Sequence, residues 1–125
     1  MLYSKDNCRF ASYVLRFLPD WNKVYCGGET VDLVHWNAGL WDCLRMIDGE
    51  LHTPLEWYKE YMERNCRSIE ILFPGAKMIF ATSTPVQEHL FGEMKRFNAD
   101  IESYNAAAIE ITRHMVARST ISIPL

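Results

Sequence analysis

Apolar residues recur every three or four positions in three stretches of the chain, a spacing that predicts amphipathic helices. The first stretch follows Asp6 and Asn7, either of which can cap a helix, and we expect Pro19 to end it. The second follows a Thr-Pro-Leu-Glu capping box at residues 53–56, with proline at the first helical position. The third starts between residues 98 and 100. The residues expected on the buried faces are Phe10, Val14, Phe17 and Leu18, then Leu55, Tyr58, Met62, Ile69 and Leu72, then Phe97, Ile101, Tyr104, Ala108, Ile111 and Met115.

Two short apolar runs alternate with these helices and predict buried strands covered on both faces, at residues 31–36 and 77–82. A third strand is expected at residues 120–123. The resulting β-α-β-α-β order is typical of an α/β fold with parallel strands and right-handed crossovers. The connecting features are a turn at Cys26-Gly27-Gly28-Glu29, a short helical segment through Leu44, Met46 and Ile47 that ends at Gly49, a helix stop at Pro74-Gly75 and a loop at Ser83-Thr84-Pro85.

Ligands of open parallel sheets bind beyond the carboxyl ends of the strands, where the loops 37–42 and 82–86 are expected. Asn37 ends an apolar strand, and its amide can donate to an oxygen that gains negative charge. Gly39 lets the backbone approach a ligand, so its N–H can assist. The structural alternative is that Asn37 caps the following turn and Gly39 only supplies an unusual φ angle.

The neighbours of Asn37 also have both structural and functional interpretations. Trp36 and Trp41 flank the loop and are expected to form core or the wall of a pocket. Asp42 is expected to cap the helical segment after the turn, or to contact a substrate. His35 is expected to be a neutral core histidine. Ser83 is the serine placed as a nucleophile would be, although the simpler interpretation is a turn residue.

Composition and charge exclude several classes of function. The 125 residues suit one ordered domain, with 49% hydrophobic residues, 23% charged residues and a net charge of −3. No basic stripe indicates nucleic-acid binding, and no apolar run or signal peptide indicates a membrane or export, which favours the cytoplasm. The cysteines have no metal-type spacing and are expected to be free thiols: Cys8, Cys26, Cys43 and Cys66.

The residues by themselves show no complete catalytic set. No G-x-S-x-G elbow or glycine-rich phosphate loop is present. His52, His89 and His114 are scattered without an evident acidic partner. The charged positions of the second helix are expected to form a solvated face: Glu56, Glu60, Glu63, Arg64 and Arg67.

Three segments resemble the SGNH hydrolases, also called GDSL esterases. The run VDLVHWNAGLWD at residues 31–42 is similar to the third conserved block of a bacterial branch of that family. The run DNCRFASY at residues 6–13 resembles the segment that precedes this block, and FNADIESYNAAA at residues 97–108 resembles the last long helix. The similarity covers the chain from about Asp6 to Ile111.

The resemblance implies a fold and an activity. The fold would be a three-layer α/β/α sandwich with a flavodoxin-like parallel sheet, and the activity would be hydrolysis of carboxylic esters by a serine, without metal or organic cofactor. The substrate would be a small-molecule or carbohydrate ester. Asn37, and the N–H of Gly39, would hold the oxyanion, and Trp36, Trp41 and Asp42 would contact the substrate.

The chain also departs from the family pattern. The G-D-S motif of the nucleophile and the D-x-x-H pair are absent, and the usual asparagine of the third block is replaced by Trp41. We therefore expect residues 1–125 to be one partial domain, an internal fragment that is inactive alone. The alternative hypothesis is a non-catalytic α/β module that binds a ligand or protein, and open sheet edges would favour a homo-oligomer.

Overall fold

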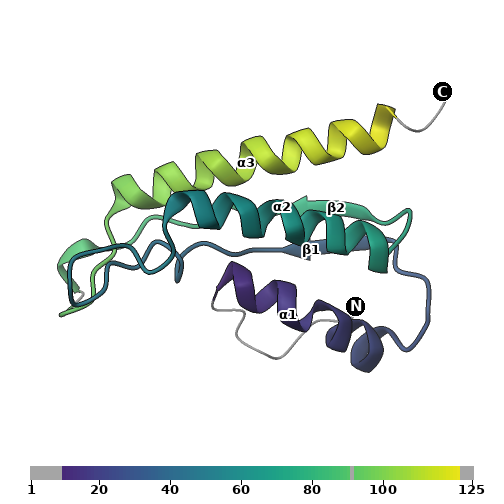
Figure 1. Cartoon of the computed structure of the whole chain (residues 1–125), viewed down its shortest axis with the longest axis horizontal. Helices are drawn as coiled ribbons and strands as arrows, with labels where there is room; N and C mark the ends of the chain where they lie inside the picture. Colours follow the sequence, from purple (N-terminus) through teal and green to yellow (C-terminus); the bar gives the residue numbers. More distant parts are fainter. Residues whose placement is uncertain (1–9, 91, 122–125) are drawn as a thin grey trace.

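The computed structural model describes residues 10–90 and 92–121, and Figure 1 shows the order of their elements. Helix α1 (Ala11–Trp21) continues into a wider π-helical turn, η1 (Asn22–Cys26). Strand β1 (Leu33–Trp36), helix α2 (Leu55–Leu72) and strand β2 (Lys77–Phe80) follow. A short 3₁₀ turn, η2 (Glu88–Leu90), precedes the long helix α3 (Asn98–Ile121).

The strands β1 and β2 form a parallel two-stranded sheet, as the alternation of helices and strands predicts. Leu33 lies opposite Lys77, and Trp36 lies opposite Phe80. Helix α2 is the crossover between the two strands. The described part of the chain is therefore a mixed α/β structure with three α-helices.

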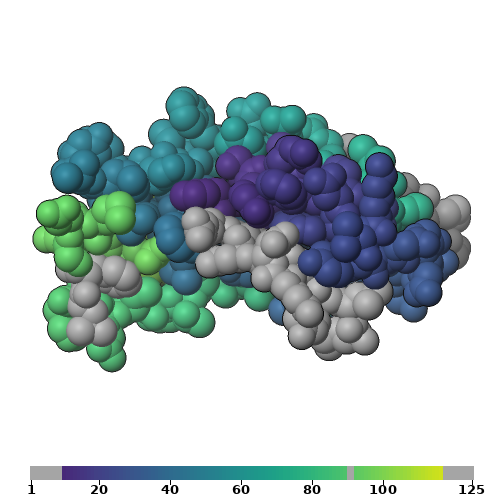
Figure 2. Space-filling view, turned by 90° about the horizontal axis from the view of Figure 1, so that it is seen from below, coloured from purple at the N-terminus to yellow at the C-terminus, as the bar shows by residue number. Residues whose placement is uncertain are grey.

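Helix α2 packs between α1 and α3 and contributes the centre of the core (Figure 1). Its buried positions include the expected Tyr58, Met62 and Ile69. The buried residues around them come from both other helices and from the loop after β1: Ala11, Val14, Leu18, Ala38, Cys43, Ile101, Tyr104 and Ala108. Seen from the side of α1, the molecule is elongated, with the turn after α1 (dark blue) at one end and the segment before α3 (light green) at the other (Figure 2).

The expectation that both faces of the strands are covered is wrong for the described residues. Val34, Trp36, Met78 and Phe80 are partly buried against the helical core. The side chains that alternate with them point the other way, and Leu33 and Ile79 are 51% and 40% exposed. The described helices therefore leave one face of the sheet open.

Pro19 does not end the first helix, contrary to expectation, because α1 continues to Trp21. Proline removes one helical hydrogen bond and costs about 3 kcal/mol in a helix interior. Here its ring is exposed, and apolar contacts continue across it. Phe17 stacks on Tyr13 with ring centroids 4.4 Å apart and on Trp21 at 6.1 Å.

Two other local expectations are also wrong. Residues 44–49 form no helix, because Arg45 pairs with Lys95 through backbone hydrogen bonds of 2.7 and 2.9 Å. The expected third strand overlaps α3, which runs through Ile121, and the remainder of that strand lies outside the described residues. Asp6, Asn7 and Cys8 also lie outside them.

The predicted start of α3 and the predicted end of α2 are confirmed, but the capping box is not. Pro54 is the N-cap residue of α2, and no side chain caps this end of the helix. The Thr53 hydroxyl lies 3.0 Å from Nδ1 of His52 instead. At the other end, Phe73 and the positive-φ residue Gly75 terminate α2, as Pro74-Gly75 predicts.

Candidate functional site at the carboxyl edge of the sheet

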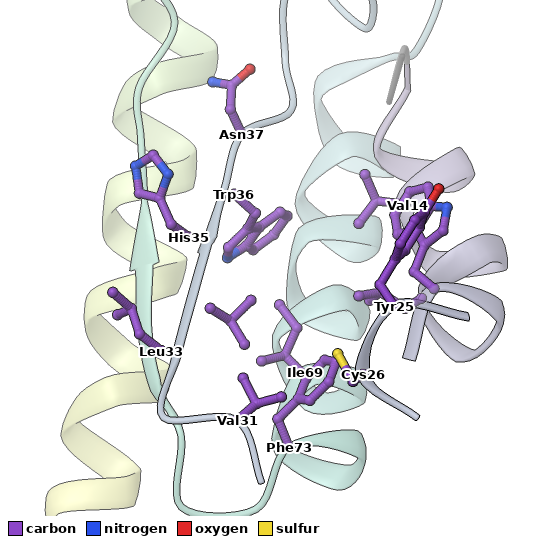
Figure 3. A pocket seen from close by; sticks show the side chains of 13 residues that line it. Val14, Tyr25, Cys26, Val31, Leu33, His35, Trp36, Asn37, Ile69 and Phe73 are labelled. Atoms are coloured by element: carbon purple, nitrogen blue, oxygen red, sulfur yellow. The ribbon is translucent and has the colours of Figure 1, made fainter. Parts of the chain in front are cut away.

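The loops that leave the carboxyl ends of β1 and β2 meet, as predicted. Asn37 directly follows β1 and points beyond its end (Figure 3). Its Nδ2 donates to the carbonyl oxygen of Ala81 at 2.6 Å, and it lies 3.5 Å from Oγ of Ser83. Asn37 therefore bridges to the second loop and does not cap the turn that follows it.

The position of Ser83 is fixed by α3 through a residue that sequence reasoning missed. The Ser83 N–H donates to Oδ1 of Asn105 at 2.8 Å, and Nδ2 of Asn105 donates to the Ser83 carbonyl at 2.9 Å. Asn98, two turns earlier on α3, makes the same pair of bonds to the backbone of Val86, at 2.8 and 3.0 Å. The available signal was two asparagines seven positions apart, next to the apolar stripe of a predicted helix.

Gly39 has a structural reason to be glycine. Its φ is +153°, which side chains rarely adopt, and an added Cβ would lie 3.1 Å from Oη of Tyr58 and 3.2 Å from Oγ of Ser83. The Tyr58 hydroxyl donates to the carbonyl of Ala38 at 2.6 Å. The unusual φ angle of the structural alternative is thus present, and the close packing brings Gly39 beside Ser83.

Asp42 is fully buried and caps a helix, but not the helix that we expected. Its Oδ2 accepts the N–H of Ala11 at 3.0 Å, at the first turn of α1. Burial raises the pKa of Asp42, and the hydrogen bond from Ala11 opposes that increase. This side chain is therefore occupied structurally and is not open to a substrate.

The aromatic residues that flank the loop separate into two environments. Trp36 lines the same groove as Asn37 (Figure 3) and makes an edge contact with Phe80, with centroids 4.9 Å apart. Trp41 instead makes an edge contact with Phe10, with ring centroids 5.8 Å apart, and Cζ of Arg96 lies 5.3 Å from the centroid of the Trp41 ring. His35 is exposed on the open face of the sheet, so the expected core histidine is wrong.

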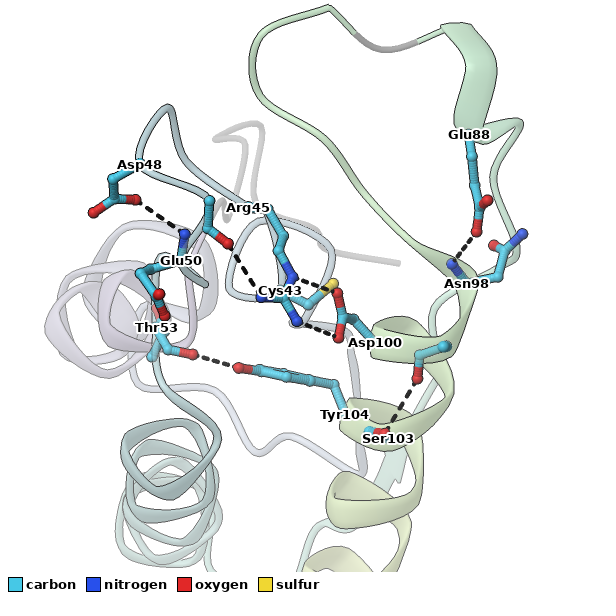
Figure 4. Close-up of polar contacts among 12 residues, drawn as sticks. Cys43, Arg45, Asp48, Glu50, Thr53, Glu88, Asn98, Asp100, Ser103 and Tyr104 are labelled. Carbon is cyan, nitrogen blue, oxygen red and sulfur yellow. Dashed lines mark hydrogen bonds and ion pairs between the residues drawn. The ribbon is translucent and has the colours of Figure 1, made fainter.

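A second polar network anchors the loop after β1 to α3 (Figure 4). The Arg45 guanidinium donates two hydrogen bonds to Asp100, at 2.9 and 3.0 Å. The Tyr104 hydroxyl donates to the Thr53 carbonyl at 2.5 Å. These contacts fix the loop next to the candidate site without entering it.

The described residues bring no nucleophile and base together at this edge. The Ser83 hydroxyl lies 3.5 Å from Nδ2 of Asn37, the backbone of Ser83 bonds to the side chain of Asn105, and no histidine is among these partners. Burial raises the pKa of Cys43 to about 11 and that of Cys66 to about 12, so both thiols are protonated at neutral pH. Cys26 is also a free thiol.

No protein-family model, curated protein or solved structure matches the chain. Within residues 10–90 and 92–121, no cluster of three metal-ligating side chains is found. The helices of that same part contain none with the length and apolarity to cross a membrane.

Proposed function

We propose that the chain forms part of an SGNH-type ester hydrolase, in which Asn37 stabilises the oxyanion formed when an acyl carbonyl is attacked. The proposal rests on the motif at residues 31–42 and on the position of its asparagine at the carboxyl edge of a parallel sheet. The substrate class is a small-molecule or carbohydrate ester.

The observation that carries the proposal is how the Asn37 amide uses its two protons. One N–H is held by the Ala81 carbonyl at 2.6 Å, which fixes the orientation of the side chain. The other faces Oγ of Ser83 at 3.5 Å, the limit of a hydrogen bond. This second N–H is therefore held in a fixed direction by the first bond, and it is available to a stronger acceptor, such as an oxyanion.

The roles of the other residues follow from their positions. The N–H of Gly39 is the second oxyanion donor in this proposal, because Gly39 packs against Ser83 at the same edge. Trp36 forms an apolar wall beside Asn37. The attacking serine and its base come from residues outside those that the structure describes. In enzymes with a complete site, removal of one such donor lowers kcat by about 10²–10³.

We also propose that this α/β unit belongs to a three-layer sandwich with a flavodoxin-like sheet. Parallel pairing, a helical crossover and an open second face of the sheet support that arrangement.

A titration can test the oxyanion site without catalysis. An alkyl methylphosphonate is an anion with tetrahedral geometry, like the intermediate of ester hydrolysis. Added at millimolar concentration to the ¹⁵N-labelled chain, it should shift the NMR signals of the Asn37 side-chain amide and of the Gly39 N–H. Asn37→Ala should abolish the Gly39 shift, and the control Asn22→Ala, at a half-buried position in η1, should keep it. Unchanged signals at Asn37 and Gly39 would contradict the proposed site.

The chain alone should not hydrolyse p-nitrophenyl acetate above the rate in buffer, because the described site lacks a nucleophile and base. Turnover that Ser83→Ala abolishes would instead identify Ser83 as the nucleophile. The second candidate function is a binding module without catalysis, which is favoured because the described site lacks a nucleophile and a base. Hydrolysis by a longer form of the protein, lost on Asn37→Ala, would decide between the two.

A further inference from the structure

The outer edge of β1 carries backbone groups that β2 does not use. The carbonyls of Asp32 and Trp36 accept the N–H groups of Lys77 and Ala81, at 2.9 and 2.8 Å. In a parallel ladder, alternate residues of one strand bond to the same neighbour. The N–H and C=O groups of Leu33 and His35 therefore point away from β2, and no described residue bonds to them.

A groove of about 380 Å³ runs along this edge, between β1, α1 and the end of α2 (Figure 3). Val14 and Leu18 of α1 form one wall, and Val34 and Trp36 of β1 form the other. Among the described residues that line the groove, none is an Asp, Glu, Lys or Arg. A charge buried against this lining would lose its hydration without gaining a partner, so the inward side of an occupant should be uncharged.

We propose that this groove is the docking site of an extended polypeptide strand, which pairs with the outer edge of β1 and inserts alternate apolar side chains into the groove. The backbone groups of Leu33 and His35 favour a polypeptide over a lipid as the occupant. An acyl chain would bury these groups without hydrogen bonds, whereas a strand would bond to them.

A single strand fits this site better than a second copy of the chain. Helix α1 lies beyond β1, on the side away from β2 (Figure 1), and forms the far wall of the groove. Pairing of two β1 edges would bring a second α1 to the same place. The proposal does not depend on ester hydrolysis, since it rests on the backbone groups of Leu33 and His35, although Trp36 and Asn37 also line the groove.

The test attaches the occupant to the whole chain, so that weak pairing is still observed. A strand of about eight residues, alternating threonine and valine, is fused through a flexible linker of about 12 residues. The matched control fusion has lysine in place of each valine. Amide hydrogen exchange should slow by about tenfold at Leu33 and His35 with the valine strand only. The amides of Val34 and Trp36, which already face β2, are the internal reference.

Groove variants keep the test specific. Val31→Asp, in the groove lining, should abolish the slowing, whereas Ile47→Asp, at a site 78% exposed, should not. Equal slowing by the lysine strand would overturn the proposal. So would slow exchange of Leu33 and His35 in the unfused chain when light scattering shows a monomer, because the edge would then be covered already. Slow exchange that accompanies dimerisation of the unfused chain would identify a second copy as the occupant and would likewise overturn it.

Discussion

Asp42 is the residue whose buried side chain joins the two segments that flank the site. Its carboxylate caps α1 from a position 31 residues away, and its backbone carbonyl accepts the Thr53 N–H before α2. Asp42→Ala should therefore lower the free energy of unfolding by about 0.5–2 kcal/mol, the usual cost of a lost N-cap. Urea unfolding followed by circular dichroism measures this loss. A value within error of zero would show that the cap contributes no stability.

The same carboxylate gives the stability a defined pH dependence. Burial raises its pKa in the folded chain above the ordinary 3.8, so the folded state binds this proton more tightly than the unfolded state. The contribution of Asp42 to the free energy of unfolding therefore falls as pH rises from the unfolded pKa through the folded pKa. Asp42→Asn, which can still accept the Ala11 N–H, should remove that part of the pH dependence. An unchanged pH profile would mean that other groups cause it.

A matched pair of alanine substitutions tests whether the side-chain contacts around Gly39, and not only its positive φ, require a glycine there. Gly39→Ala places a Cβ 3.1 Å from Tyr58 and 3.2 Å from Ser83, in addition to the strain of its positive φ. Gly49→Ala also has a positive φ but meets open space. We expect about 1–3 kcal/mol from strain in each variant and a clearly larger loss for Gly39→Ala, measured by thermal unfolding. Equal losses would show that the contacts at Gly39 relax without cost.

At the scale of elements, helix α3 positions the loop after β2 through its asparagines. Asn105→Ala removes both hydrogen bonds to Ser83 and should speed amide exchange at Ser83 by about fivefold to tenfold, equivalent to about 1 kcal/mol. Asn98→Ala is the control, because it should speed exchange at Val86 and leave Ser83 protected. If Ser83 exchanges at the wild-type rate in Asn105→Ala, α3 does not position this loop.

The elements that could be predicted from the sequence are those whose signals are local. The apolar faces of α2 and α3 could be predicted because apolar residues recur every third or fourth position. Most of these residues are buried, Leu55, Leu72 and Ile111 are partly buried, and Phe97 is 38% exposed. The path of α1 across Pro19 was not predicted, because aromatic stacking that offsets the proline depends on three-dimensional contacts. The bridge between Arg45 and Lys95 joins distant residues, so residues 44–49 carried no local sign of it.

The same distinction applies to the candidate site. Its place at the carboxyl edge of the sheet could be predicted, because parallel strands bring the loops 37–42 and 82–86 together. The partners of Asn37 and Ser83 could not, because they depend on how α3 docks. The sequence also could not predict which helix Asp42 caps, because the hydrogen bond from Ala11 to Asp42 joins residues 31 positions apart.

At the scale of the whole molecule, the helices bury one face of the sheet and leave the other open. Two isoleucines test this directly: Ile69 on α2 is 2% exposed, whereas Ile79 on β2 is 40% exposed on the open face. The same change to threonine should cost about 2 kcal/mol at Ile69, where apolar area leaves the core. At Ile79 it should cost less than about 0.5 kcal/mol, because solvent already reaches the side chain.

Urea unfolding of the two isoleucine variants provides the comparison, with light scattering to confirm that both are monomeric. Threonine keeps the β-branched shape at Ile79, so strand propensity changes little and the measured difference reports burial. If Ile79→Thr is as destabilising as Ile69→Thr in a monomer, the second face is covered within the isolated chain. If the loss at Ile79 is small, that face is free to receive another layer, as the proposed three-layer sandwich requires.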